Sequence, residues 1–292
     1  MDDRHPKRSL KYAIGITAII FLAEVAGGLI SGSLALLGDA AHMFQDVVAL
    51  LLSLGAIAVA ERLPTPSRTF GYHRVEIAAA VANGLLLAGI SGIIAWQAIL
   101  RFSHPRPIES TVMLAVAAAG LFANVAAAYV LHGSHDLNVR SAFLHVLGDL
   151  LSSVAVIGAA VWIALTGQTV VDPLLGLVIA GVILISSLSI LRDAAGILLQ
   201  FAPRGIDTEE VIRRIESVEG VEGVHNVHLW SLCSNINVLD AHVYSCETDM
   251  ARIERMKREI KQRLEQFRIR HSTLEFECDR CENCDVIRHL ED

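Results

Sequence analysis

Long apolar runs alternate with short polar connections over the first 200 residues of the chain. Six runs are about 20 residues long or longer, which is the length that an α-helix needs to cross the hydrocarbon core of a bilayer. They cover residues 12–30, 34–60, 77–100, 111–131, 142–165 and 173–191. The pattern predicts a bundle of six transmembrane helices, with Asp172 as the cap and Pro173 as the first residue of the last one.

The pattern changes after Pro203, where charged residues become frequent. Residues 207–218 and 250–267 have the periodicity of amphipathic helices, and residues 224–232, 238–244 and 272–278 alternate as strands do. This order predicts a C-terminal αββαβ domain of the α+β class, with a metallochaperone-like (ferredoxin-like) fold. We therefore expect an N-terminal segment (1–11), a transmembrane domain (12–200) and a soluble domain (203–292).

Composition and charge agree with a membrane protein. The chain is 53% hydrophobic and 19% charged, and its mean hydropathy is +0.50. The net charge of −7 without a basic stripe gives no reason to expect nucleic acid as a partner. Most basic residues of the membrane domain lie before the first run, between the second and third runs, and between the fourth and fifth. These three segments lie on one side of the membrane, so the positive-inside rule places both termini in the cytoplasm. In a bacterium the membrane would be the plasma (inner) membrane.

Two of the apolar runs carry the same polar motif, a histidine followed four residues later by an aspartate. These are His42 with Asp46, and His145 with Asp149. Four residues make about one helical turn, so both side chains of each pair share a helix face. Two such faces would present two imidazoles and two carboxylates, a ligand set that suits tetrahedral Zn²⁺.

Other interpretations of the intramembrane polar groups stay open. The two pairs could be buried hydrogen bonds that hold helices together. Ionisable residues at this depth more often mark an ion or proton path. Glu24 could line a water-filled cavity or hydrogen-bond a neighbouring helix, and Asp39 could be a helix cap or a vestibule charge. Asn83 and Asn124 are expected to hydrogen-bond other helices.

A second group of candidate ligands follows the transmembrane runs. Cys278, Cys281 and Cys284 form a Cys-x-x-Cys-x-x-Cys motif, which is typical of soft-metal binding in a reduced compartment. Histidines on adjacent strands could complete that site with Glu277. The candidates are His225, His242 and, less strongly, His271. His228 lies an odd number of residues from His225, so an unbroken strand would turn it to the opposite face. His73, in a loop, is a further candidate.

These motifs resemble the cation diffusion facilitator family, in its zinc-transporting branch. The resemblance rests on residues 31–46 (SGSLALLGDAAHMFQD), 70–76 (FGYHRVE), 138–149 (NVRSAFLHVLGD) and 224–230 (VHNVHLW). It implies a zinc/proton antiporter with a transport site made by His42, Asp46, His145 and Asp149. It also implies a homodimer whose cytoplasmic domain binds regulatory or structural Zn²⁺. The cytoplasmic ligands would be His225, His242, Glu277, Cys281 and Cys284, and His73 matches a loop ligand of some members.

The sequence departs from the family at two places, and other functions compete with transport. Only His132 and His135 remain of the histidine-rich loop that many relatives have, and the N-terminus has one histidine, His5, and no cysteine. An intramembrane metalloprotease would need a motif such as His-Glu-x-x-His, which does not occur. A passive metal channel and a membrane-anchored metal sensor are the other rivals. We expect no enzymatic activity.

Overall fold

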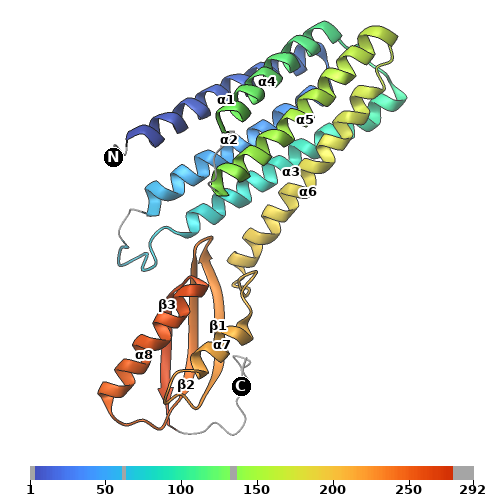
Figure 1. The fold of residues 1–292 in the computed structure, drawn as a ribbon. Helices are drawn as coiled ribbons and strands as arrows, with labels where there is room; N and C mark the ends of the chain where they lie inside the picture. Colours follow the sequence, from blue (N-terminus) through green and yellow to red (C-terminus); the bar gives the residue numbers. More distant parts are fainter. Residues whose placement is uncertain (1–3, 61–63, 132–136, 279–292) are drawn as a thin grey trace. The chain divides into compact units, whose positions relative to one another are not determined.

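The computed structural model describes residues 4–60, 64–131 and 137–278 (Figure 1). Within these ranges, the side chains of residues 4–17, 127–131, 137–146 and several positions between 46 and 60, Asp46 among them, are not described. The chain divides into two compact units. One contains residues up to 54 and residues 82–190, and the other contains residues 55–81 and the chain from 191 onward.

The first 200 residues form long helices. Their bounds are α1 Arg4–Ser31, α2 Leu34–Ala60, α3 Arg74–Ser103, α4 Ser110–Leu131, α5 Leu137–Thr166 and α6 Val171–Leu198. Each predicted apolar run lies within one of these helices. Among the described residues, three segments are long and apolar enough to cross a membrane: Arg74–Ser103, Leu147–Thr166 and Val171–Leu198. Ala18–Ser31 and Ser110–Ala126 are shorter apolar helices.

Small residues allow these helices to approach closely. A Cβ atom on Gly27 of α1 would lie 2.7 Å from Val116 Cγ2 of α4, and one on Gly176 of α6 would lie 3.0 Å from Leu34 Cβ of α2. Such contacts are how helices associate where lipid removes the hydrophobic drive between them. Asn124 Nδ2 of α4 lies 3.5 Å from Ser153 Oγ of α5, which confirms the interhelical hydrogen bond expected of Asn124. Asn83 Oδ1 of α3, by contrast, is buried and makes no hydrogen bond with any described atom.

Asp172 forms the main polar contact at one end of the helical unit. It is fully buried and accepts hydrogen bonds from the Ser33 hydroxyl at 2.5 Å and from the Leu34 amide at 2.9 Å. The Arg101 guanidinium lies 3.3 Å from Asp172 Oδ2, the oxygen that also accepts from the Leu34 amide, and it donates to the Gly32 carbonyl. The prediction that Asp172 caps its own helix was wrong. The helix begins at Val171, and the carboxylate caps the N-terminus of α2 instead.

The C-terminal unit carries a three-stranded sheet of order β1-β2-β3. The elements are α7 Thr208–Glu216, β1 Gly223–Cys233, β2 Ile236–Tyr244, α8 Met250–Leu264, the 3₁₀ turn η1 Glu265–Phe267 and β3 Ile269–Glu277. β1 and β2 are antiparallel, whereas β2 and β3 are parallel and joined through α8. The predicted order αββαβ is therefore confirmed. Asp207 caps α7 as expected, because its side chain accepts from the Glu209 amide.

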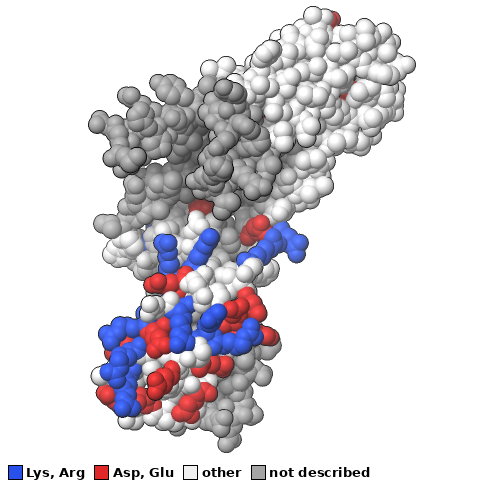
Figure 2. Space-filling model, viewed as in Figure 1, with Lys and Arg blue, Asp and Glu red and all other residues white. Residues whose placement is uncertain are grey.

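The two helices cover one face of this sheet (Figure 1). The core joins Val211 and Ile215 of α7 and Ile260 of α8 to Leu239 and Val243 of β2. Side chains of a strand alternate between faces, so the residues between these buried positions turn to the face without helices. Charged side chains gather over the C-terminal unit, whereas they are rare on the visible described surface of the helices (Figure 2).

We predict that Asp172→Asn destabilises the protein much more than Asp193→Asn. The first change leaves the largely buried Arg101 without its carboxylate and replaces one of the two acceptor oxygens at the start of α2 with an amide group, which costs about 3 kcal/mol. The second removes an ion pair between Asp193 and Arg204 whose side chains are 51% and 56% exposed, which costs less than about 1 kcal/mol. Thermal unfolding in detergent, followed by circular dichroism, measures both. Equal unfolding temperatures for the two variants would contradict the prediction.

Candidate metal sites

A histidine and an aspartate from two different helices meet within the apolar unit. His42 Nε2 of α2 lies 3.3 Å from Asp149 Oδ1 of α5. Both side chains are mostly shielded from solvent. The contact brings one residue of each predicted pair together across α2 and α5. The side chains of the other two, Asp46 and His145, lie outside the described residues.

A second contact joins the same two helices one turn away. Ser152 of α5 donates a 2.5 Å hydrogen bond from its hydroxyl to Asp39 Oδ1 of α2. Asp39 precedes His42 by three residues and Ser152 follows Asp149 by three, so each lies one turn from its neighbour on the same face. Asp39 is 4% exposed. This bond fixes α2 against α5 at the level where His42 faces Asp149.

The sheet builds a second cluster on the face without helices. His225 of β1 is directly opposite His242 of β2, and His242 is opposite Glu275 of β3. Glu277 lies two residues after Glu275, so it shares that face. The sequence places ligands here because each strand alternates buried and outward positions in this stretch.

The three side chains of His225, His242 and Glu277 converge tightly. One ligand atom of each lies within 4.8 Å of the others. His242 Nδ1 is 2.6 Å from Glu277 Oε1, and His225 Nε2 is 3.1 Å from Glu277 Oε2. Two imidazoles and a carboxylate are the donor set of three-ligand zinc sites. Metal ligands must be deprotonated, so metal binding at this cluster depends on pH.

A β-bulge changes the expected orientation of His228. The register shifts between His225 and His228, and Asn226 has a φ of 50°. His228 consequently pairs with Asp240, which lies on the same face as His242. The expectation that His228 turns to the opposite face was therefore wrong. Sequence alternation alone did not reveal the bulge, although Asn tolerates this left-handed conformation better than most residues.

Asn226 and Glu275 are two site residues that sequence reasoning missed. The Asn226 side chain bridges two histidines, with Nδ2 at 3.0 Å from His242 Nε2 and Oδ1 at 3.2 Å from His228 Nε2. Glu275 Oε2 lies 3.6 Å from His242 Nε2. Glu275 lies two residues before Glu277, and Asn226 lies one residue after His225. This closeness in sequence indicates a shared site only once the pairing of the strands is known.

The remaining candidates are spread over several places. His271 is on β3 six residues before Glu277 and makes an edge contact with the Phe70 ring, with centroids 5.4 Å apart. His73 directly precedes α3, outside the one group of three potential ligands found among the described residues. Cys278 follows β3 and is exposed, and Cys246 Sγ lies 3.7 Å from its carbonyl oxygen. Cys281 and Cys284 lie outside the described residues, as do His132 and His135.

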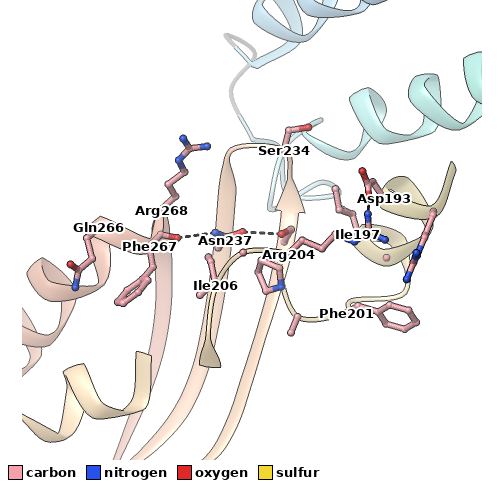
Figure 3. Close-up of a pocket in the computed structure, with 16 residues that line it drawn as sticks. Asp193, Ile197, Phe201, Arg204, Ile206, Ser234, Asn237, Gln266, Phe267 and Arg268 are labelled. Atoms are coloured by element: carbon pink, nitrogen blue, oxygen red, sulfur yellow. Dashed lines mark hydrogen bonds and ion pairs between the residues drawn. The ribbon is translucent and has the colours of Figure 1, made fainter. Parts of the chain in front are cut away.

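A cavity in the C-terminal unit has no potential metal ligands apart from one paired carboxylate. It has a volume of about 630 Å³ and is lined by residues of the end of α6, the segment after it, and the sheet edge (Figure 3). Its lining contains no histidine or cysteine, and its one carboxylate, Asp193, pairs with Arg204. The candidate metal chemistry of the described residues is therefore at the two clusters above.

Apolar helices with a partly buried histidine–aspartate contact, followed by a charged domain with a cluster of potential metal ligands, indicate a membrane protein that handles cations. The comparisons with known proteins identify the family. Residues 10–199 match the cation efflux transmembrane domain, and residues 203–277 match the cation efflux protein cytoplasmic domain. The chain belongs to the cation efflux, or cation diffusion facilitator, family. It is a membrane transporter family and not a family of enzymes.

Several relatives are similar over most of their length. A metal cation efflux system protein CzcD of Cupriavidus metallidurans is 40% identical, over 98% of this chain and 92% of the relative. The zinc transporter ZitB of Escherichia coli is 47% identical, over 71% and 67%. A cadmium, cobalt and zinc/H⁺–K⁺ antiporter of Bacillus subtilis is 38% identical, over 88% and 85%.

We predict that His242→Ala lowers the zinc affinity of the cytoplasmic cluster by at least about tenfold, because it removes one of three converging donors. His271→Ala is the matched control, since it removes an exposed imidazole from the same sheet away from the cluster. Both changes are made in the full chain with His42→Ala, so that the membrane site does not contribute. Competition with a chromophoric chelator measures the affinity. The prediction fails if the two variants bind Zn²⁺ equally well.

Proposed function

We propose that this protein exports Zn²⁺ from the cytoplasm in exchange for protons, by alternating access. The observation that carries the proposal is the contact between His42 and Asp149, on two separate apolar helices. The relatives are named as a zinc transporter and as an antiporter of cadmium, cobalt and zinc, which supports the same substrate class. Export serves either efflux from the cell or loading of a compartment.

The transport site consists of His42 and Asp46 of α2 with His145 and Asp149 of α5. Two imidazoles and two carboxylates satisfy a tetrahedral Zn²⁺. The helical spacing of each pair supports this assignment, because it turns both members toward the same neighbouring helix. The Asp39–Ser152 hydrogen bond one turn away holds the two faces in register.

Protons and Zn²⁺ compete for the same lone pairs at this site. Zn²⁺ binds from the cytoplasm when the histidines are neutral and the aspartates ionised, because metal ligands must be deprotonated. When the site opens to the far side, protons bind to the ligands and the metal leaves. The protonated site then opens to the cytoplasm again and releases its protons there. Histidine suits this exchange because its ordinary pKa of about 6.5 lies close to physiological pH.

The topology and domain organisation form part of the same proposal. Residues 12–200 make a six-span transport domain, residues 1–11 precede it in the cytoplasm, and residues 203–292 make a cytoplasmic domain. Both termini are cytoplasmic, in the plasma (inner) membrane if the organism is bacterial. The distribution of basic residues supports this orientation, and the apolar length of α3, α5 and α6 supports membrane crossing.

The cytoplasmic domain binds regulatory or structural Zn²⁺ and joins two chains into a homodimer. Its ligands are His225, His242 and Glu277, with Cys281, Cys284 and Cys278 from the terminal motif. The position of Cys278 directly after Glu277 supports a role for that motif, whereas His271 lies at a distance from the cluster. The αββαβ order supports a metallochaperone-like (ferredoxin-like) fold. Bound metal would neutralise carboxylates and let two such domains approach.

We predict that His42→Ala and Asp149→Ala each reduce zinc flux to the rate of empty liposomes. Each change removes one of four donors, and a water molecule in the place of the lost side chain would bind Zn²⁺ more weakly. The measurement is zinc uptake into proteoliposomes with an imposed pH gradient. His104→Ala, which alters an exposed histidine at the end of α3, serves as the control. Normal flux in both site variants would rule out the proposal, and flux that ignores the pH gradient would favour a channel.

We predict that the double change Cys281→Ser and Cys284→Ser alters metal content more than transport. The thiolates bind metal in the cytoplasmic domain and not in the path of the ion. The expected result is fewer zinc ions per purified chain with a transport rate within about twofold of the wild type. Elemental analysis and the same flux assay check it. Complete loss of transport with unchanged metal content is the opposite outcome.

A further inference from the structure

Glu24 is a buried carboxylate that the proposed transport site does not use. It lies in the middle of the apolar half of α1 and is 1% exposed. Its Oε2 atom makes no hydrogen bond with any described atom. An ionised carboxylate without donors costs several kcal/mol in such surroundings, whereas the neutral acid costs far less. This arrangement therefore favours a protonated Glu24.

The neighbouring helix leaves space for this side chain. α4 packs beside α1 (Figure 1), and a Cβ atom on Gly120 of α4 would lie only 2.7 Å from Glu24 Oε1. Any larger residue at that position would displace the carboxyl group. The described segment 110–126 of α4 contains no titratable residue, so α4 supplies no counter-charge.

The charges that act on Glu24 come from the helices of the transport site. α1 packs against α2 close to these residues, because the rings of Phe21 and Phe44 lie 5.6 Å apart. Asp39 of α2 and Asp149 of α5 would repel a negative charge on Glu24. Among the described side chains of α2 and α5, His42 is the only one that can become positive, and it is paired with Asp149. Without metal, the cluster has an excess of acids. A divalent cation between α2 and α5 would offset that excess and make an ionised Glu24 acceptable.

We propose that Glu24 is a separate proton site of the exchange, coupled to the metal by charge and not by coordination. This inference rests on the proposed function. It adds Glu24 to Asp46 and Asp149 as a third carboxylate that binds a proton during the exchange. When Zn²⁺ binds, the O–H bond of Glu24 breaks, its electron pair stays on the carboxylate oxygen, and the proton leaves to water. When Zn²⁺ departs, Glu24 takes up a proton again.

The number of protons released per zinc tests this role. In the full-length protein, the slope of log binding constant against pH equals the protons released when Zn²⁺ binds. Glu24→Gln keeps the shape of the side chain but cannot titrate, so we expect its slope to be about one proton lower than that of the wild type. Glu109→Gln, which changes an exposed carboxyl, should keep the wild-type slope. An unchanged slope in Glu24→Gln overturns the inference.

An infrared measurement on the wild type keeps the test independent of how that variant folds. Zinc binding should remove the carbonyl stretch of a protonated carboxylic acid from the difference spectrum, and Glu24→Asp should shift this band. The absence of such a band in the wild type overturns the inference. A wild type that binds Zn²⁺ but moves no protons against it would instead refute zinc/proton exchange, while a normal exchange with an unchanged Glu24→Gln slope refutes only the role of Glu24.

Discussion

A carboxylate among apolar helices is stable only where another helix supplies donors or a positive charge for its oxygens. Asp172 satisfies this condition through Ser33, the N-terminus of α2 and Arg101. Asp39 satisfies it through Ser152. Because each of these groups depends on a different helix, the polar contacts fix which helices are neighbours, while the small residues between them determine how closely the helices approach.

The same constraint bears on the transport site that we propose in the middle of the bundle. His42 and Asp149 stabilise each other at a distance that a metal ion or a proton can bridge. Glu24 has no such partner for one of its oxygens among the described atoms. The carboxylates that secure the fold therefore have partners on neighbouring helices, whereas the groups proposed for transport depend on what binds beside them. A transport site must release its ion, so its ligands cannot be as fully satisfied within the protein as the Asp172 carboxylate is.

The cytoplasmic cluster reaches a similar ligand set from a different scaffold. Pairing of three strands, and not helical spacing, brings His225, His242 and Glu277 together. The bulge at Asn226 also turns His228 to this face and places an amide between the two histidines. A sheet backed by a packed core is rigid, which suits a site that retains its metal rather than passing it on.

Local patterns determined the elements of this protein. The apolar runs, the αββαβ order, the cap at Asp207 and the two His-x-x-x-Asp turns can all be read from residues close together in the sequence, because helix length, strand alternation and helical spacing are local properties. Tertiary structure decided the rest. It chose α2 as the helix that Asp172 caps, brought His42 to Asp149, introduced the bulge that reorients His228, and placed Glu24 against Gly120. These outcomes depend on which elements pack together over long distances along the chain, and no local pattern contains that information.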